Sequence, residues 1–114
     1  GIGMLPKSSL MQKLNQYYLS HGYRFETVIA DSAQISKFAV VEPGVQVFSG
    51  TIVQAGAFIG AHSVINSGAI IEHDCHIGRY NHIAPRATLC GQVITQENVY
   101  VGAGSTVIQN LKIE

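Results

Sequence analysis

Aliphatic residues recur along this chain with a period of six. Stepping by six residues from Ile29 to Ile113, fourteen of the fifteen positions hold Ile, Leu or Val. The 85 residues of this stretch contain only 24 such residues, so chance would place about four of them at these positions. The fourth residue after each aliphatic position is small or apolar, as at Ala57 and Cys75. The pattern indicates an internal repeat rather than a mixture of ordinary helices and strands.

A six-residue repeat of this kind is typical of a parallel β-helix. Three short strands with their turns close a triangular coil of about 18 residues, so that residues one coil apart stack on each other. The aliphatic positions then form three columns, which fill the axis of the prism as a one-dimensional core. Glycine suits the corners, where a positive φ or a close backbone approach is needed. The repeat is unbroken from Ile29 to Ile113, which predicts an all-β domain without an inserted loop.

The first 28 residues follow a different pattern. Apolar residues recur there at helical spacing, with Ser8 or Ser9 as a candidate N-cap and Gly22 after the last turn. We therefore expect one short α-helix before the coils. The organisation expected is a region 1–28 that ends an N-terminal domain, followed by a β-helix over 29–114. Because the chain stops two residues into a repeat, we also expect this β-helix to be incomplete and the chain to be a fragment of a longer protein.

Composition narrows the function classes. Seven Lys and Arg balance seven Asp and Glu, and no basic cluster is present, which argues against nucleic acid or an anionic membrane as the main partner. No apolar run approaches the roughly 20 residues that a membrane span needs, and a signal-peptide layout is absent. A cytoplasmic protein is expected. Cys75 and Cys90 are therefore expected to be free thiols rather than a disulfide.

Histidine provides the clearest chemical signal. Four of the five histidines fall in a 21-residue window: His62, His73, His76 and His82. Such a cluster on a β-helix fits either a metal site or a general base for acyl transfer. The spacings of 11, 3 and 6 residues do not match the three-histidine zinc pattern of the γ-class carbonic anhydrases on this kind of fold, so no metal is predicted.

His73 is the candidate general base. It lies at the third position of its repeat, which points away from the axis, and its neighbours one coil away are Ala55 and Gly91. Two small neighbours would leave a notch around the imidazole, and Asp74 can orient it and raise its basicity. The alternative is an exposed histidine at a seam between subunits. Asn66, one repeat earlier, is a candidate to line the same cleft, although turn chemistry explains Asn66 equally well.

His82 lies nine residues after His73, which is half of an 18-residue coil. The two histidines should therefore lie on different sides of one prism. Three-fold packing of prisms would bring different faces of neighbouring chains together, and this predicts a site built from two subunits.

The run Asn66-Ser-Gly-Ala-Ile-Ile-Glu-His-Asp-Cys-His-Ile-Gly-Arg-Tyr-Asn-His82, continuing to Val99-Tyr-Val-Gly-Ala-Gly-Ser, resembles the sugar acetyltransferases of the left-handed β-helix class. The nearest branch contains the sialic-acid O-acetyltransferase-like proteins and the UDP-4-amino-sugar N-acetyltransferases. The resemblance covers essentially the whole chain. It implies a left-handed coil, against the usual right-handed preference of crossovers.

The resemblance also implies residue roles. The family's general base falls on His73, and the acidic residue that increases its basicity falls on Asp74. Contacts to acetyl-CoA fall on His82 and Ala103, and Gly91 lies near the path of the pantetheine arm. The implied reaction is direct attack on the thioester, which requires no acyl-enzyme and therefore no nucleophilic cysteine.

The resemblance implies less about how the substrate is bound. Family members carry an N-terminal domain that holds a nucleotide sugar, and Gly3 resembles its last substrate-contacting glycine. Together with Asn66, this gives two candidate substrate-binding residues. We expect an acetyl-CoA-dependent, homotrimeric acetyltransferase acting on the amino group of a nucleotide-linked sugar in bacterial glycan synthesis. The alternatives are an O-acetyltransferase of sialic acid or a related sugar, and a non-catalytic β-helix used only for trimerisation.

Overall fold

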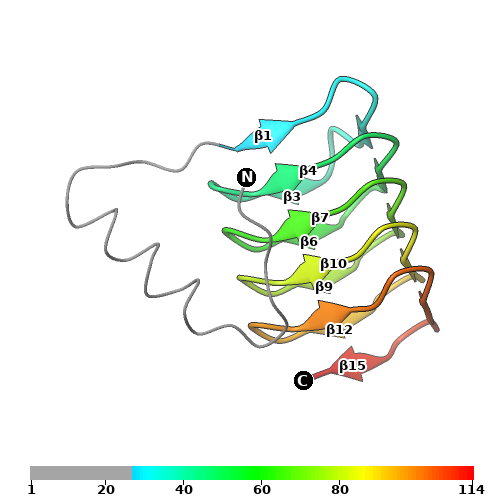
Figure 1. Cartoon of the computed structure of the whole chain (residues 1–114). Helices are drawn as coiled ribbons and strands as arrows, with labels where there is room; N and C mark the ends of the chain where they lie inside the picture. Colours follow the sequence, from blue (N-terminus) through cyan, green and yellow to red (C-terminus); the bar gives the residue numbers. More distant parts are fainter. Residues whose placement is uncertain (1–26) are drawn as a thin grey trace, which may run out of the picture.

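A computed structural model describes residues 27–114, which form fifteen strands of two residues each, separated by four-residue corners. The strands stack in successive coils, as Figure 1 shows. The predicted all-β parallel helix with three repeats per coil is confirmed. The helix expected before the coils and Gly3 lie outside the described residues. No helix in the described part of the chain is long and apolar enough to cross a membrane.

The strands form three parallel sheets, one for each side of the prism. Sheet A contains β1 (Val28–Ile29), β4 (Gln46–Val47), β7 (Val64–Ile65), β10 (His82–Ile83) and β13 (Tyr100–Val101). Sheet B contains β2 (Gln34–Ile35), β5 (Ile52–Val53), β8 (Ile70–Ile71), β11 (Thr88–Leu89) and β14 (Thr106–Val107). Sheet C contains β3 (Val40–Val41), β6 (Phe58–Ile59), β9 (His76–Ile77), β12 (Ile94–Thr95) and β15 (Lys112–Ile113). The turns that join consecutive sheets are called the A/B, B/C and C/A corners.

Backbone hydrogen bonds between coils set the register. The amide of Ile70 donates to the carbonyl of Ala87 at 2.9 Å, and the amide of Glu72 donates to that of Leu89 at 2.9 Å. Each strand residue therefore pairs with the residue 18 positions further on, as Ile71 does with Leu89. This register stacks the aliphatic columns that the repeat predicts.

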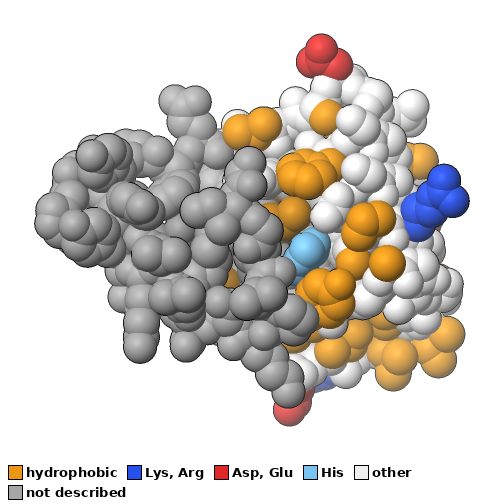
Figure 2. Space-filling model, in the orientation of Figure 1, with side chains coloured by type: hydrophobic (Ala, Val, Ile, Leu, Met, Phe, Trp, Pro, Cys, Tyr) orange, Lys and Arg blue, Asp and Glu red, His pale blue; other side chains and the backbone are white. Residues whose placement is uncertain are grey.

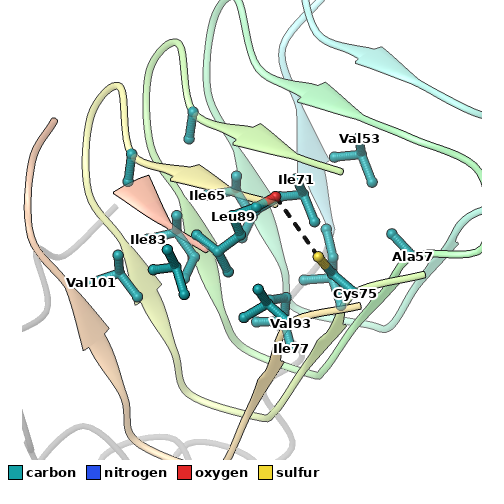
Figure 3. Packing of buried hydrophobic residues seen from close by; sticks show 14 of the residues in the cluster. Val53, Ala57, Ile65, Ile71, Cys75, Ile77, Ile83, Leu89, Val93 and Val101 are labelled. Carbon is teal, nitrogen blue, oxygen red and sulfur yellow. Dashed lines mark hydrogen bonds between the residues drawn. The ribbon is translucent and has the colours of Figure 1, made fainter. Parts of the chain in front are cut away.

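The core consists of these columns together with the small residues at the corners. Ile65, Ile71, Ile77 and Ile83 are completely buried, and Figure 3 shows their side chains converging along the axis. Thr95 is the one polar residue in the aliphatic series, and it is 2% exposed. Its hydroxyl accepts a hydrogen bond from the Gly78 amide at 3.1 Å, so the buried oxygen is satisfied.

The corners impose a second regularity. A positive φ occurs at every sixth position from 44 to 110, at the fourth position of each repeat. Five of these twelve residues are glycines, and the others are His62, Asp74, Tyr80, Arg86, Gln92, Asn98 and Asn110. Glycine at the second position has a different cause, because a Cβ on Gly60 would lie 2.7 Å from the Arg79 nitrogen.

This difference predicts how glycine substitutions affect stability. Gly60→Ala should lower the free energy of unfolding by roughly 1–3 kcal/mol, because the Cβ meets backbone that cannot move aside. Gly102→Ala is the matched control. It has the same place in its repeat, lacks a positive φ, and its Cβ would meet only the Ser105 hydroxyl, at 3.4 Å. The control should be neutral or stabilising by up to about 1 kcal/mol in denaturant unfolding. Equal losses for both variants would contradict the close-approach explanation.

Candidate active site

His73 and Asp74 lie side by side at the B/C corner, between β8 and β9. Nδ1 of His73 is 3.2 Å from Oδ2 of Asp74, and the two side chains are 53% and 58% exposed. Asp74 occupies the positive-φ position of its repeat, with φ 58°. Asp tolerates this conformation better than most residues. The corner geometry therefore brings the carboxylate beside the imidazole.

Glycines in the neighbouring coils leave room for both side chains. The His73 ring lies over Gly91 of the next coil, where a Cβ would overlap it, and Asp74 Oδ1 lies over Gly56 of the previous coil in the same way. The backbone holds this arrangement, because the Gln92 amide donates to the His73 carbonyl at 3.0 Å. The stacking of His73 with Gly91 agrees with the 18-residue spacing. Gly56 was missed in the sequence, although its place 18 residues before Asp74 could have identified it.

The pair has the geometry of an oriented general base. A carboxylate can only accept, so His73 donates its Nδ1 hydrogen to Asp74 and carries its lone pair on Nε2. Nε2 is the atom nearest to where a Gly91 side chain would begin. Nε2 thus occupies the space that the missing side chain of Gly91 leaves. Because both groups are about half exposed, solvent screens their charge interaction, and orientation is the main effect of Asp74.

His82 lies elsewhere, on the outer face of sheet A in β10. A B/C corner is opposite sheet A in a triangular prism, so the two histidines are on different sides of one chain, as predicted. Asn66 and Ala103 both belong to the A/B corner that borders sheet A. The amide nitrogen of Asn66 is 3.3 Å from Nε2 of His82. Asn66 therefore lies beside His82, one corner away from His73 within the same chain.

Sheet A presents a largely uncharged outer surface around His82. The His82 ring meets the Tyr100 ring edge-on, with 5.1 Å between centroids and 87° between planes. Val64 is its strand partner on the other side. Figure 2, drawn in the orientation of Figure 1, shows mainly hydrophobic side chains around a histidine on this face. Tyr100 was not selected from the sequence, although it lies one coil after His82.

The other clustered histidines have packing contacts. His76 on sheet C stacks on Phe58, with 4.6 Å between centroids. His62 stacks on Tyr80 at 5.2 Å. Burial, aided by the positive charge of nearby Arg79, lowers the pKa of His62. The described part of the chain contains no group of three His, Cys, Asp or Glu side chains that could hold a metal ion.

A groove of about 430 Å³ lies over sheet C and does not include His73. Its lining residues are Glu42, Phe58, His76, Gly78, Arg79, Ile94, Thr95, Gln96 and Glu97. This groove and the His73–Asp74 pair are thus separate features of residues 27–114. Among residues 27–114, His73 with Asp74 is the candidate base, because there a carboxylate contacts a half-exposed imidazole.

Cys75 and Cys90 are both free thiols. Cys75 points into the core with 1% exposure, and its thiol donates to the carbonyl of Cys90 at 3.1 Å and more weakly to that of Leu89 at 3.9 Å. Figure 3 shows the second contact. Burial is the main cause that raises the pKa of the Cys75 thiol. A buried thiol with a raised pKa is a poor nucleophile.

Comparison with known proteins supports the repeat and the fold. Residues 56–91 match the family model of the bacterial transferase hexapeptide, described as six repeats. GDP-perosamine N-acetyltransferase of Escherichia coli O157:H7 is 28% identical over 113 residues, which cover 94% of this chain and 48% of the relative. The structure of PerB from Caulobacter crescentus in complex with CoA and GDP-perosamine is 29% identical, with a TM-score of 0.68, over 96% of this chain and 62% of that one.

The acetyltransferase domain of PglB from Neisseria gonorrhoeae has a similar fold, with a TM-score of 0.78 at 22% identity, over 94% of this chain and 61% of that one. The repeat, the three parallel sheets and these similarities define the chain as a hexapeptide-repeat β-helix. Part of its sequence and its fold are similar to those of bacterial hexapeptide transferases. The chain spans about half the length of the curated relative and about three fifths of the solved chains that it matches.

The two thiols should differ in reactivity. At pH 7–8 the raised pKa leaves little Cys75 thiolate, so iodoacetamide should modify the partly buried Cys90 and spare Cys75 in the folded protein. Peptide mass spectrometry would measure both sites. The variant Cys90→Ser should then remain unmodified until denaturant is added. Rapid modification of Cys75 in the folded variant would show that its thiol is accessible.

Proposed function

We propose that this chain forms the catalytic β-helix of an acetyl-CoA-dependent N-acetyltransferase that acts on a nucleotide-linked amino sugar. The observation that carries the proposal is the His73–Asp74 pair, in which a half-exposed imidazole lies over Gly91 and contacts a carboxylate through Nδ1. Similarity to GDP-perosamine N-acetyltransferases supports the reaction class. We expect the reaction to take place in the cytoplasm as one step of bacterial glycan synthesis.

His73 acts as the general base in this proposal. The sugar amine attacks the thioester carbon, and Nε2 of His73 removes a proton from the amine nitrogen as the new C–N bond forms. Asp74 stabilises the resulting imidazolium through Nδ1. The imidazolium then returns the proton to the departing thiolate as the C–S bond breaks, so that amide and free CoA thiol are the products. Cys75 takes no part, because its thiol lies in the core.

Gly91 contributes space and a backbone donor. Its amide donates none of the backbone hydrogen bonds found among residues 27–114, whereas its carbonyl accepts one from Asn110 at 3.1 Å. Next to the His73 ring, this amide can donate to the thioester oxygen as negative charge develops there. We assign the coenzyme contact expected at Gly91 to this group.

We further propose a homotrimer with each site shared by two subunits. His73 and His82 lie on different sides of one chain, so one chain alone cannot supply both to a single acetyl group. The bases of one subunit would face the sheet A side of its neighbour, which carries His82 and Ala103 as coenzyme contacts. The nucleotide sugar would be held partly by Gly3, outside the described residues.

Replacement of the base gives the primary test. In the protein expressed from its complete natural gene, His73→Ala should lower kcat by about 10²- to 10⁴-fold, the usual contribution of a general base. Asp74→Asn should cause a smaller loss, and Cys75→Ser should retain most activity. Thiol release from acetyl-CoA would be followed with a panel of UDP-, dTDP-, GDP- and CMP-linked amino and hydroxy sugars.

The same panel distinguishes the alternatives. Turnover only with hydroxyl acceptors would indicate an O-acetyltransferase. Absence of both turnover and coenzyme binding would support a trimerising β-helix without catalysis. A loss with Cys75→Ser as large as that with His73→Ala would contradict direct attack.

Mixed trimers test the shared site. Chains carrying His73→Ala and chains carrying His82→Ala would be denatured together in equal amounts and refolded. Half of the His73 positions and half of the facing His82 positions are then intact, so about one quarter of the sites should be complete. Activity near one quarter of the wild-type value supports sharing, provided that each variant alone is inactive. Activity no higher than that of the separate variants contradicts it.

A further inference from the structure

Gly56 lies one coil before Asp74 at the B/C corner, in direct contact with the Asp74 carboxylate. A Cβ on Gly56 would overlap Oδ1 of Asp74 and would lie 3.0 Å from its Cγ. The other carboxylate oxygen, Oδ2, is 3.2 Å from Nδ1 of His73. Because both oxygens belong to one planar group, a change in the position of Oδ1 also moves Oδ2. The carboxylate therefore keeps its present contact with His73 only while residue 56 has no side chain.

The backbone around this contact is held more firmly than the carboxylate. The Asp74 amide donates to the carbonyl of Ala55 at 3.1 Å, and the Gly56 amide donates to that of Phe38 at 3.0 Å. Each bond joins neighbouring coils, so moving Gly56 away from Asp74 would weaken that pairing. The Asp74 side chain is 58% exposed, and its carboxylate can rotate into solvent. A methyl group at position 56 would therefore be accommodated by displacing the carboxylate.

We propose that Gly56 is a positioning residue for the reaction at His73 and that it acts through Asp74. The missing side chain lets the Asp74 carboxylate lie where Oδ2 accepts the Nδ1 hydrogen of His73. The neutral imidazole is then held as the tautomer with its lone pair on Nε2, the nitrogen that removes the proton in the proposed reaction. This inference rests on the proposed function, in which Asp74 orients the base.

Gly50 allows the contact with Asp74 to be separated from backbone strain. Gly56 has a φ of 79°, so a side chain there is strained whatever space it has. Gly50 has the same place in its repeat and a φ of 71°. A Cβ on Gly50 would meet only backbone atoms of Gly68, at 3.8 Å, which is an ordinary van der Waals distance. Gly50→Ala is therefore the matched control, with similar strain and no displaced carboxylate.

The two alanine variants should differ in activity but not in stability. In the protein expressed from its complete natural gene, Gly56→Ala should lower kcat roughly 10- to 100-fold, because His73 is no longer held in position. Its KM values should stay near those of the wild type, and Gly50→Ala should keep wild-type kcat. Both variants should shift the urea midpoint of unfolding by similar amounts. Wild-type kcat in Gly56→Ala, or equal losses of kcat in both variants, would overturn the inference.

Combination with Asp74→Ala tests whether Gly56 acts through Asp74. If it does, Gly56→Ala should cause no further loss of kcat in the Asp74→Ala background. Losses that multiply would overturn the positioning role. Full activity of Asp74→Ala alone would overturn both this inference and the role of Asp74 in the proposed function. A fully active Gly56→Ala beside an impaired Asp74→Ala would overturn this inference alone.

The tautomer of His73 gives a readout that does not depend on turnover. In ¹⁵N-labelled protein, at a pH where the ring is neutral, Nδ1 of His73 should give the shift of a protonated nitrogen and Nε2 that of an unprotonated one. Gly56→Ala should lose this preference, whereas Gly50→Ala should keep it. An unchanged tautomer in Gly56→Ala would contradict the inference even if the activity of this variant were reduced.

Discussion

The coil-to-coil backbone hydrogen bond is the interaction on which the rest of this structure depends. A two-residue strand has no stability of its own, and each exists only because its amides and carbonyls pair with strands one coil above and below. Pairing of residues 18 apart, as between Ile71 and Leu89, then stacks residues at the same repeat position on each other. The apolar columns, the corners and the outward-facing side chains are consequences of that one register.

The same register creates the candidate site. Residues 18 apart in sequence become neighbours, so Gly91 provides the space over His73 and Gly56 provides it over Asp74. Residues nine apart become opposites, which separates His73 from His82 within one chain. A groove also lies over sheet C, and its lining does not include His73 or Asp74. The same spacing therefore determines both the fold and the candidate site. The shared site that we propose would bring His73 of one subunit close to His82 of another.

The coils and their register could be predicted from the sequence, because the backbone pattern repeats every six residues. Individual side-chain contacts do not repeat, so they could not be predicted in the same way. The period of six gave the coils, the columns and the outward position of His73. The period did not predict that glycine is needed for two different reasons. Gly56 has a positive φ, whereas the backbone of the next coil approaches Gly60 too closely for a Cβ. The period also did not reveal that Asn66 contacts His82, which lies 16 residues away and is reached diagonally between coils. The predicted helix and Gly3 lie outside residues 27–114.

The corner geometry also explains why chemistry arises at one corner among many. At each corner the third residue points outward and the fourth has a positive φ from position 44 onward, so every repeat places two side chains side by side. Most repeats fill these positions with pairs such as Ser67–Gly68, Pro85–Arg86 or Ala103–Gly104, which have no base. Only His73–Asp74 combines an imidazole with a carboxylate, and glycines flank it in the coils on both sides. The fold thus places two such side chains next to each other in every repeat. At one corner, the choice of His73 and Asp74 together with Gly91 and Gly56 in the neighbouring coils makes this pair the candidate base.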